Sequence, residues 1–287
     1  MSMDVLAAGI LAGGLYALVG LGISLVFGVL KLMNLAHGEL VMAGAYIASL
    51  FVVNAGWDPL VALPFAMTAV AVIAYPLQRL LLTPLLRGSA TAPLVGTFGV
   101  SLVGQAIFQA VFGSHPKNLP ASYATEGISV GGVRVQTVYV ISFVLTIVLC
   151  LVTHFVLTRT RAGGAVRAAA ADPTTAAILG LNVNRIYAFT MAGAAALAAA
   201  GGVMTGVAQS FTPTSGLPLL LTGFAVMALA GIGSVGGVFA AGVALGVIQS
   251  LSVSTFGGGW RDVVVYVLFL VVLAVRPQGL FRRAAPA

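Results

Sequence analysis

The feature that most constrains this chain is a succession of long apolar runs with short polar stretches between them. The first run, Val5–Leu30, is longer than the roughly 20 residues that a helix needs to cross a bilayer. Over the whole chain 60% of residues are hydrophobic and only 7% are charged, whereas charged residues make up about a quarter of a soluble domain. Too few polar residues are present to cover a soluble core, so the bilayer must be the solvent of this protein.

The runs predict an all-α polytopic membrane protein with about eight or nine transmembrane helices in a single domain, residues 1–287. The expected spans are 5–30, 40–53, 60–82, 93–112, 137–157, 187–208, 219–230, 238–254 and 262–275. The seventh and ninth are short, which leaves eight or ten spans open as well. Residues 128–135 predict a small β-hairpin around Gly131-Gly132.

Small residues recur four positions apart in three of the expected helices. Such pairs let helix backbones approach closely within a membrane. They predict a tightly packed bundle, and they are Gly9/Gly13, Gly202/Gly206 and Gly242/Gly246.

The net charge of +7 is distributed singly between apolar runs, which argues against nucleic-acid binding and fits cytoplasmic loops. Residues 158–186 form the strongest positive cluster, because Arg159, Arg161, Arg167 and Arg185 stand against Asp172 alone. With this loop in the cytoplasm, the N-terminus is expected outside, and the C-terminus, with Arg276, Arg282 and Arg283, inside. The single Cys150 excludes an internal disulfide and a cysteine-based metal site.

The stretch Asn34–Glu39 places a histidine and a glutamate between two apolar runs. Facing lipid, such charges would cost a few kcal/mol each. One interpretation is a helix start at the cytoplasmic interface, where Asn34 caps, Glu39 complements the helix dipole and His37 is solvated. A second is a broken helix at membrane depth, whose N-terminus meets an anionic group of a substrate. A proton relay through His37 and Glu39 is a third.

The glycine-rich stretch Gly231–Gly237 also has two interpretations. It can be a tight turn or close helix crossing, or unwound backbone beside a translocation path. A phosphate-binding loop is excluded, because the stretch has no lysine and lies between spanning helices.

The positive loop predicts two short helices along the cytoplasmic face. Residues 166–171 are helix formers that include Arg167, and Asp172-Pro173 has the cap and first-position residues of a second helix, which ends at Gly180. They can dock a soluble partner, or they can be an ordinary surface helix that carries positive-inside charge.

No catalytic constellation is present in the sequence. No His/Glu pair has the spacing of a helical zinc site, no Gly-x-Ser-x-Gly elbow occurs, and His115 and His154 stand alone and are interpreted as structural. We therefore expect no enzyme, no metal and no cofactor. Transport driven by ATP would need another chain to hydrolyse it. A proton-coupled secondary transporter of small zwitterionic solutes is the alternative.

Several motifs, in one order along nearly the whole chain, resemble the LivH-type permeases, the membrane subunits of bacterial ABC importers for branched-chain amino acids. The motifs are Gly14-Leu15-Tyr16-Ala17-Leu18, Leu21-Gly22, Phe27-Gly28-Val29, Asn34–Glu39, Gly44-Ala45-Tyr46, Ala176–Gly180 with Leu181-Asn182, Gly231–Gly237 and Arg276–Leu280. Two positions depart from the family pattern. Ala171 stands where the family usually has an acidic residue, and Gly164 stands where an arginine is common.

The resemblance implies a bacterial inner-membrane assembly. Its other parts would be a second, LivM-type permease, two cytoplasmic ATP-binding subunits and a periplasmic or lipid-anchored amino-acid-binding protein. The candidate substrate pathway comprises Asn34, His37, Gly38, Glu39, Gly44, Gly231, Gly233, Ser234, Gly236 and Gly237. The candidate ATPase-coupling residues are Arg167, Ala170, Ala171, Asp172, Pro173, Ala177, Leu179 and Gly180. Such systems select their substrate mainly through the binding protein.

Overall fold

A computed structural model of the chain describes residues 3–86, 88, 91–130, 133–231 and 233–275. The first half contains α1 (Met3–Leu30), α2 (His37–Ala55), α3 (Pro59–Pro76), the π-helical turn η1 (Leu77–Leu82), α4 (Thr83–Leu85), α5 (Ala92–Phe112) and α6 (Ser122–Thr125). The strands β1 (Gly127–Val130) and β2 (Val133–Gln136) precede α7 (Thr137–Arg159), α8 (Arg161–Ala171) and α9 (Pro173–Ile178). The chain continues through α10 (Val183–Ala208), the 3-10 turn η2 (Pro213–Ser215), α11 (Gly216–Ala230), α12 (Val235–Phe256) and α13 (Trp260–Val275).

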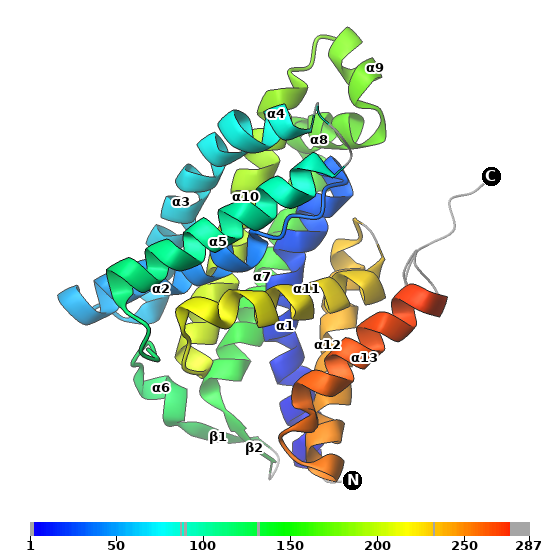
Figure 1. The fold of residues 1–287 in the computed structure, drawn as a ribbon. Coiled ribbons are helices and arrows are strands. Elements are labelled where there is room, and N and C mark those ends of the chain that lie inside the picture. The colour runs from blue at the N-terminus through cyan, green and yellow to red at the C-terminus, as the bar shows by residue number, and fades with distance from the viewer. Residues whose placement is uncertain (1–2, 87, 89–90, 131–132, 232, 276–287) are drawn as a thin grey trace.

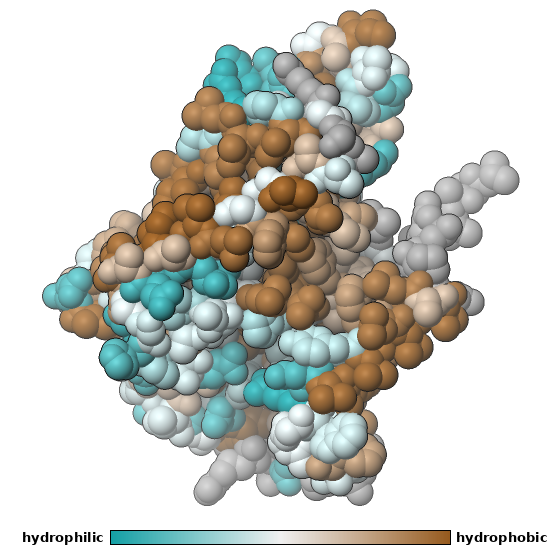
Figure 2. All heavy atoms as spheres, viewed as in Figure 1, coloured by the Kyte–Doolittle hydropathy of each residue, from teal (hydrophilic) through white to brown (hydrophobic). Residues whose placement is uncertain are grey.

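The predicted fold class is confirmed. In the described part of the chain eight helical segments are long and apolar enough to cross a membrane. The expected ninth span corresponds to α13, which has 16 residues. Apolar side chains over α3, α5 and α13 form a band across the molecule, and hydrophilic atoms gather near α8–α9 and around α6 (Figure 2).

The two polar ends of the molecule contain different segments of the chain. Helices α4, α8 and α9 lie at one end, whereas the start of α1, the β-hairpin and α6 lie at the other (Figure 1). The steep helices α1 and α7 run between these ends, and α12 lies beside the lower part of α1 (Figure 1). Helices α2, α5 and α11 run obliquely to α1 (Figure 1). The 158–186 and 113–136 loops therefore lie at opposite ends of the molecule (Figure 1).

The predicted hairpin is confirmed by its antiparallel register, with Ile128 opposite Val135 and Val130 opposite Val133. Its expected Gly131-Gly132 turn lies outside the described residues. The same holds for Arg87, Ile232 and the C-terminal Arg276–Leu280 motif, together with Arg282 and Arg283.

Glycines allow the central helices to touch backbone to backbone, as predicted. A Cβ on Gly13 of α1 would lie 2.5 Å from Val243 Cα of α12, and one on Gly246 would lie 2.3 Å from Gly9 O. Both distances are too short for any side chain, so α1 and α12 depend on these glycines. In the Gly202/Gly206 pair only Gly202 makes such a crossing, because its Cβ would lie 1.8 Å from Val41 O of α2, whereas Gly206 faces side chains.

Several predicted helix boundaries are wrong by about a turn, among them the end of the third helix and the start of the sixth. The third helix was expected to end at Leu82, but helical backbone continues through η1 and α4 to Leu85. Pro84 stands directly after the π-helical turn η1, in the last helical residues of this segment. The sixth helix starts at Val183 instead of Tyr187, because Asn182 Oδ1 accepts a hydrogen bond from Arg185 N at 3.0 Å and caps it.

Candidate functional site

The segment between α1 and α2 is held inside the protein. Helix α1 ends at Leu30, and Lys31 has a left-handed φ of 53°. Beyond it, Leu35 N donates a hydrogen bond to Thr97 Oγ1 of α5 at 3.2 Å. Asn34 Nδ2 donates to Met191 Sδ of α10 at 3.7 Å. The segment therefore packs between α5 and α10.

Asn34 does not cap α2, so that prediction is wrong. The residue before the first turn is Ala36, which makes no side-chain capping bond. Asn34 Oδ1 instead accepts from Ala36 N at 3.0 Å, and Asn34 O accepts from His37 N at 3.2 Å. Asn34 thus fixes the turn that leads into the helix, because α2 starts two residues too late for Asn34 to be its cap.

His37, the first residue of α2, is 1% exposed. A Cβ on Gly22 of α1 would lie 2.8 Å from His37 Nε2, so the imidazole packs directly against that glycine. Among the described residues neither ring nitrogen has a hydrogen-bonding partner. The interpretation in which His37 is solvated at the membrane surface is therefore wrong. An unpaired buried polar group costs about 1–3 kcal/mol, which makes His37 a candidate for function.

Glu39, in the first turn of α2, faces α5 and α11. It is 5% exposed, and its Oε1 accepts a hydrogen bond from Ser101 Oγ of α5 at 3.2 Å. Its Oε2 has no partner within the described part of the chain. A Cβ on Gly38 would lie 2.3 Å from Gly216 O, so the first turns of α2 and α11 lie side by side next to this carboxylate. The positive ends of both helix dipoles favour negative charge there.

Gly44, one turn and a half further along α2, has a packing role in this structure. A Cβ at Gly44 would lie 2.4 Å from Ala199 Cα of α10. It brings α2 close to α10 but contributes no polar group to the pathway.

The Gly231–Gly237 stretch is a tight turn between α11 and α12. Gly231 and Gly233 have φ values of 79° and 78°, which only glycine adopts without strain. Ser234 Oγ caps α12 by accepting from Gly237 N at 3.0 Å. Gly28 of α1 packs against Gly233, since a Cβ on Gly28 would lie 3.0 Å from Gly233 Cα.

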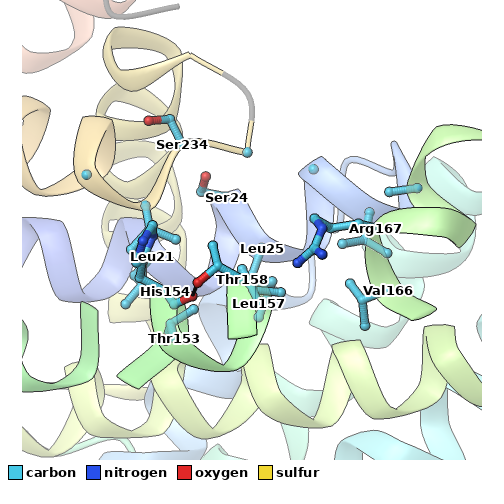
Figure 3. Close-up of a pocket in the computed structure, with 16 residues that line it drawn as sticks. Leu21, Ser24, Leu25, Thr153, His154, Leu157, Thr158, Val166, Arg167 and Ser234 are labelled. Atoms are coloured by element: carbon cyan, nitrogen blue, oxygen red, sulfur yellow. Dashed lines mark hydrogen bonds between the residues drawn. The ribbon is translucent and has the colours of Figure 1, made fainter. Parts of the chain in front are cut away.

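The same turn also borders a cavity of about 360 Å³. Its walls come from α1, α7, α8 and the turn, and they include Gly233, Ser234 and Gly236 together with Arg167 and Ala170. Figure 3 shows the Arg167 side chain extending from α8 toward Ser24 and Thr158. Two sets of residues that were predicted separately, for the pathway and for coupling, therefore meet at one cavity.

The buried His37–Glu39 pair does not line this cavity. Helix α1 lies between the His37–Glu39 pair and the cavity. Its Gly22 packs against His37, whereas the nearby Leu21 and Ser24 line the cavity. The predicted pathway residues therefore form two clusters that share α1 as a common wall.

The two predicted short helices are present as α8 and α9. Asp172 caps α9 by accepting from Thr174 N at 2.8 Å and Thr175 N at 3.2 Å, and Pro173 occupies the first position. Hydrogen bonds from the Thr175 hydroxyl, and then from the Thr175 and Thr174 amides, hold the pKa of Asp172 below its usual value. The helix ends before Gly180, which has a φ of 85°.

The outer face of α9 is apolar although it projects from the molecule. Ile178 is 80% exposed and Leu179 is 74% exposed. Ala171, Asp172, Pro173, Ala177 and Gly180 are exposed as well. Projecting apolar residues next to charged ones are typical of a surface that binds another protein.

Sequence reasoning missed several polar residues that the fold brings together. Ser101 reaches Glu39, and Ser24, Thr153 and Thr158 line the cavity. A third group lies on α1, α12 and α13, where Arg261 Nη2 donates to Tyr16 OH at 2.8 Å and Tyr16 OH donates to Gln249 Oε1. No spacing rule in the sequence connects positions 16, 249 and 261.

Comparison with known proteins gives a consistent result. The family described as "Branched-chain amino acid transport system / permease component" matches residues 5–273. The chain is 31% identical to the high-affinity branched-chain amino acid transport system permease protein BraD of Pseudomonas aeruginosa, over 97% of this chain and 95% of that protein. It is 29% identical to the permease protein LivH of Escherichia coli K12, over 96% of this chain and 94% of that protein.

A solved structure shares the fold at lower sequence similarity. A chain of PsaBC from Streptococcus pneumoniae in complex with Fab superposes with a TM-score of 0.50 at 17% identity. The match covers 96% of this chain and 91% of that one.

Proposed function

Because this chain belongs to the family of permease components of branched-chain amino acid transport systems, we propose that it forms one half of the translocation pathway of an ATP-driven importer for branched-chain or related amino acids. Family membership confirms the resemblance inferred from the sequence motifs. The observation that carries the proposal is the match to BraD and LivH over at least 96% of the chain.

The substrate pathway includes the entry of α2, with Asn34, His37, Gly38 and Glu39. The two ring nitrogens of His37 and Oε2 of Glu39 have no partner among the described residues. This supports the assignment, because these atoms are available to new partners when the helices move. The turn at Gly231, Gly233, Ser234, Gly236 and Gly237 forms the second part. Gly44 maintains the close α2–α10 contact on which the first part depends.

Coupling to ATP hydrolysis takes place at α8 and α9. The exposed apolar residues Ile178 and Leu179 support docking of a cytoplasmic ATP-binding subunit, with Ala171, Asp172, Pro173, Ala177 and Gly180 around them. Arg167 and Ala170 connect this surface to the cavity beside the Gly231–Gly237 turn. A movement of α8 would therefore directly change the wall of the cavity that borders the pathway.

The assembly has other protein components. The sequence has no nucleotide-hydrolysing motif, so two cytoplasmic ATP-binding subunits supply the energy. A LivM-type permease completes the pore, and a periplasmic or lipid-anchored binding protein delivers the amino acid. The α8–α9 end lies in the cytoplasm and the N-terminus outside, as the arginines of residues 158–186 favour.

Reconstitution of the full assembly in liposomes tests the proposal. Leucine uptake should require ATP, and the Ile178→Asp/Leu179→Asp variant should lose most of it because charge replaces the apolar docking face. Asn118→Asp, an exposed substitution in the 113–136 loop that also adds negative charge, is the control and should retain uptake. Uptake by this chain alone, driven by a proton gradient, would contradict the proposal.

A further inference from the structure

A polar cavity of about 240 Å³ lies where α3 ends and α10 begins. It is lined by Arg79, Thr83, Pro84, Asn182, Asn184 and Arg185. No acidic residue is among them, and neither arginine forms an ion pair with any residue that the structure describes. Two free guanidinium groups and two amides in one hollow favour an anion with several oxygens, above all a phosphate group.

The backbone around this cavity is specialised. Residues Leu77–Leu82 form a π-helical turn, a feature that is frequent at functional sites. Thr83 closes it, because both its backbone N–H and its hydroxyl donate to Gln78 O, the hydroxyl at 2.9 Å. This π-helical turn is the part of the chain that carries Arg79. Asn182 meanwhile caps α10 and so orients the first turn of that helix, which carries Arg185.

An apolar groove of about 510 Å³ lies between the same two helices. Along α10 the cavity and groove residues are Arg185, Phe189, Ala192 and Ala196, which follow one another at helical spacing. Met67, Ala71 and Tyr75 on α3 and Arg79 on η1 follow one another at four-residue intervals in the same way. The polar cavity and the apolar groove therefore follow one continuous line along the α3–α10 contact.

Aromatic rings mark the boundary between the two. Tyr75 lies about one turn before Arg79, and Phe189 lies about one turn after Arg185. The centroids of the two rings are 5.0 Å apart. Aromatic side chains gather at this level of a bilayer, between the headgroups and the hydrocarbon. From Arg185 to Ala196 the helix rises about 16 Å, which is half of the roughly 30 Å hydrocarbon core.

We propose that the Arg79/Arg185 cavity and the α3–α10 groove together form a binding site for an anionic phospholipid. The two arginines bind its phosphate, and one acyl chain lies in the groove past Tyr75 and Phe189. A lipid with net negative charge is preferred over a zwitterionic one, because no carboxylate lines the cavity to accept a choline group. The site lies at the same end of the molecule as α8 and α9 (Figure 1).

Lipid binding to the full chain, purified in mild detergent, tests this site by native mass spectrometry. We expect phosphatidylglycerol to bind about tenfold more tightly than phosphatidylcholine, and Arg79→Gln/Arg185→Gln to remove that preference. The matched control is Arg159→Gln/Arg161→Gln, which removes the same charge from exposed positions at the same end of the molecule. It should keep the preference. An unchanged preference in the first variant overturns the proposal.

Two further measurements separate a lipid from other ligands. Ala192→Phe fills the groove away from the arginines, and it should weaken phosphatidylglycerol binding several-fold without unfolding the chain, as its melting temperature will report. If inorganic phosphate binds as tightly as the lipid and Ala192→Phe has no effect, the cavity is a free-phosphate site and the proposal is wrong. If the lipid is displaced when the complete transporter assembles, the face binds a protein, and the proposal fails equally.

Discussion

His37 combines complete burial with two ring nitrogens that have no partner in the described part of the chain. Burial without hydrogen bonds lowers stability, so such a residue has no structural advantage over an apolar one of similar size. We therefore expect its role to lie in another conformation of the protein or in contact with a bound solute.

Replacement of His37 by leucine therefore separates function from stability. We expect His37→Leu to change the free energy of unfolding by no more than about 1 kcal/mol, or to increase it, because two unpaired nitrogens are removed. ATP-dependent leucine uptake in liposomes should fall about tenfold or more, since an interaction worth about 1.4 kcal/mol already accounts for that factor. Ser49→Ala, a buried substitution on the same helix, is the control and should retain uptake. Normal uptake by His37→Leu would remove His37 from the pathway.

Asp172 gives a prediction about pH. Its folded pKa is lowered by the Thr175 hydroxyl and by the Thr175 and Thr174 amides. The contribution of this cap to stability is therefore fully present at pH values above the ordinary aspartate pKa of about 3.9. It is lost as the pH falls through the lowered pKa of Asp172 in the folded protein. At neutral pH, Asp172→Ala should accelerate hydrogen exchange of the Thr174 and Thr175 amides and reduce uptake. Asp172→Asn, which still accepts both bonds, should not. Equal exchange in the two variants would contradict the capping role.

At the scale of elements, close backbone contacts decide how the buried helices pack. Helix α10 contacts α2 at Gly202 and Gly44, and α1 contacts α12 through Gly9, Gly13 and Gly246. The entry of α2 depends on the α2–α10 contact, because α2 carries His37 and α1 lies directly against the imidazole.

Gly202→Ala tests this dependence. Its new methyl group would lie 1.8 Å from Val41 O, a backbone atom that cannot rotate away. We expect a loss of about 1–3 kcal/mol of stability from overpacking, visible as a lower melting temperature in detergent. Gly193→Ala on the same helix is the matched control, since a Cβ there meets nothing within 4 Å. It should leave the melting temperature unchanged or slightly raised, because alanine favours helix. Similar melting temperatures for the two variants would be inconsistent with the crossing.

At the scale of the whole molecule, the polar ends define how the protein lies in the membrane. The α8–α9 end carries the arginine-rich loop, and the opposite end carries the β-hairpin, α6 and the start of α1 (Figure 1). The cavity beside Arg167 is lined by residues of α8 and of the Gly231–Gly237 turn, so candidate coupling and pathway residues are neighbours there.

Single-cysteine labelling measures this orientation. The only natural cysteine, Cys150, is buried and can be replaced by serine. In that background Asn118→Cys should react with a membrane-impermeant maleimide in intact cells. Ala171→Cys should react only after the cells are made permeable, because positive loops remain in the cytoplasm. The reverse pattern would place the ATP-binding subunits on the wrong side and remove the coupling assignment.

The sequence by itself determined the class of this protein, most of its helices, the hairpin and the cap of α9. These follow from local properties: the length of apolar runs, the alternation of turn residues, and Asp172-Pro173 at a helix start. The motif series also determined the family, since it extends along most of the chain. The predicted helix boundaries were less accurate where a local feature lengthened the helix. Examples are the Asn182 cap of α10 and the π-helical turn at Leu77–Leu82 after α3.

Only the tertiary structure decided how the polar residues are grouped. It placed His37 in the interior, paired Ser101 with Glu39, and aligned Arg79 with Arg185 at the end of one groove. Such groups join residues from different helices, and in an apolar bundle the approach of helices is set by small residues and by packing of their surfaces. That packing depends on the whole set of contacts, whereas the apolar runs report only that each segment is a helix.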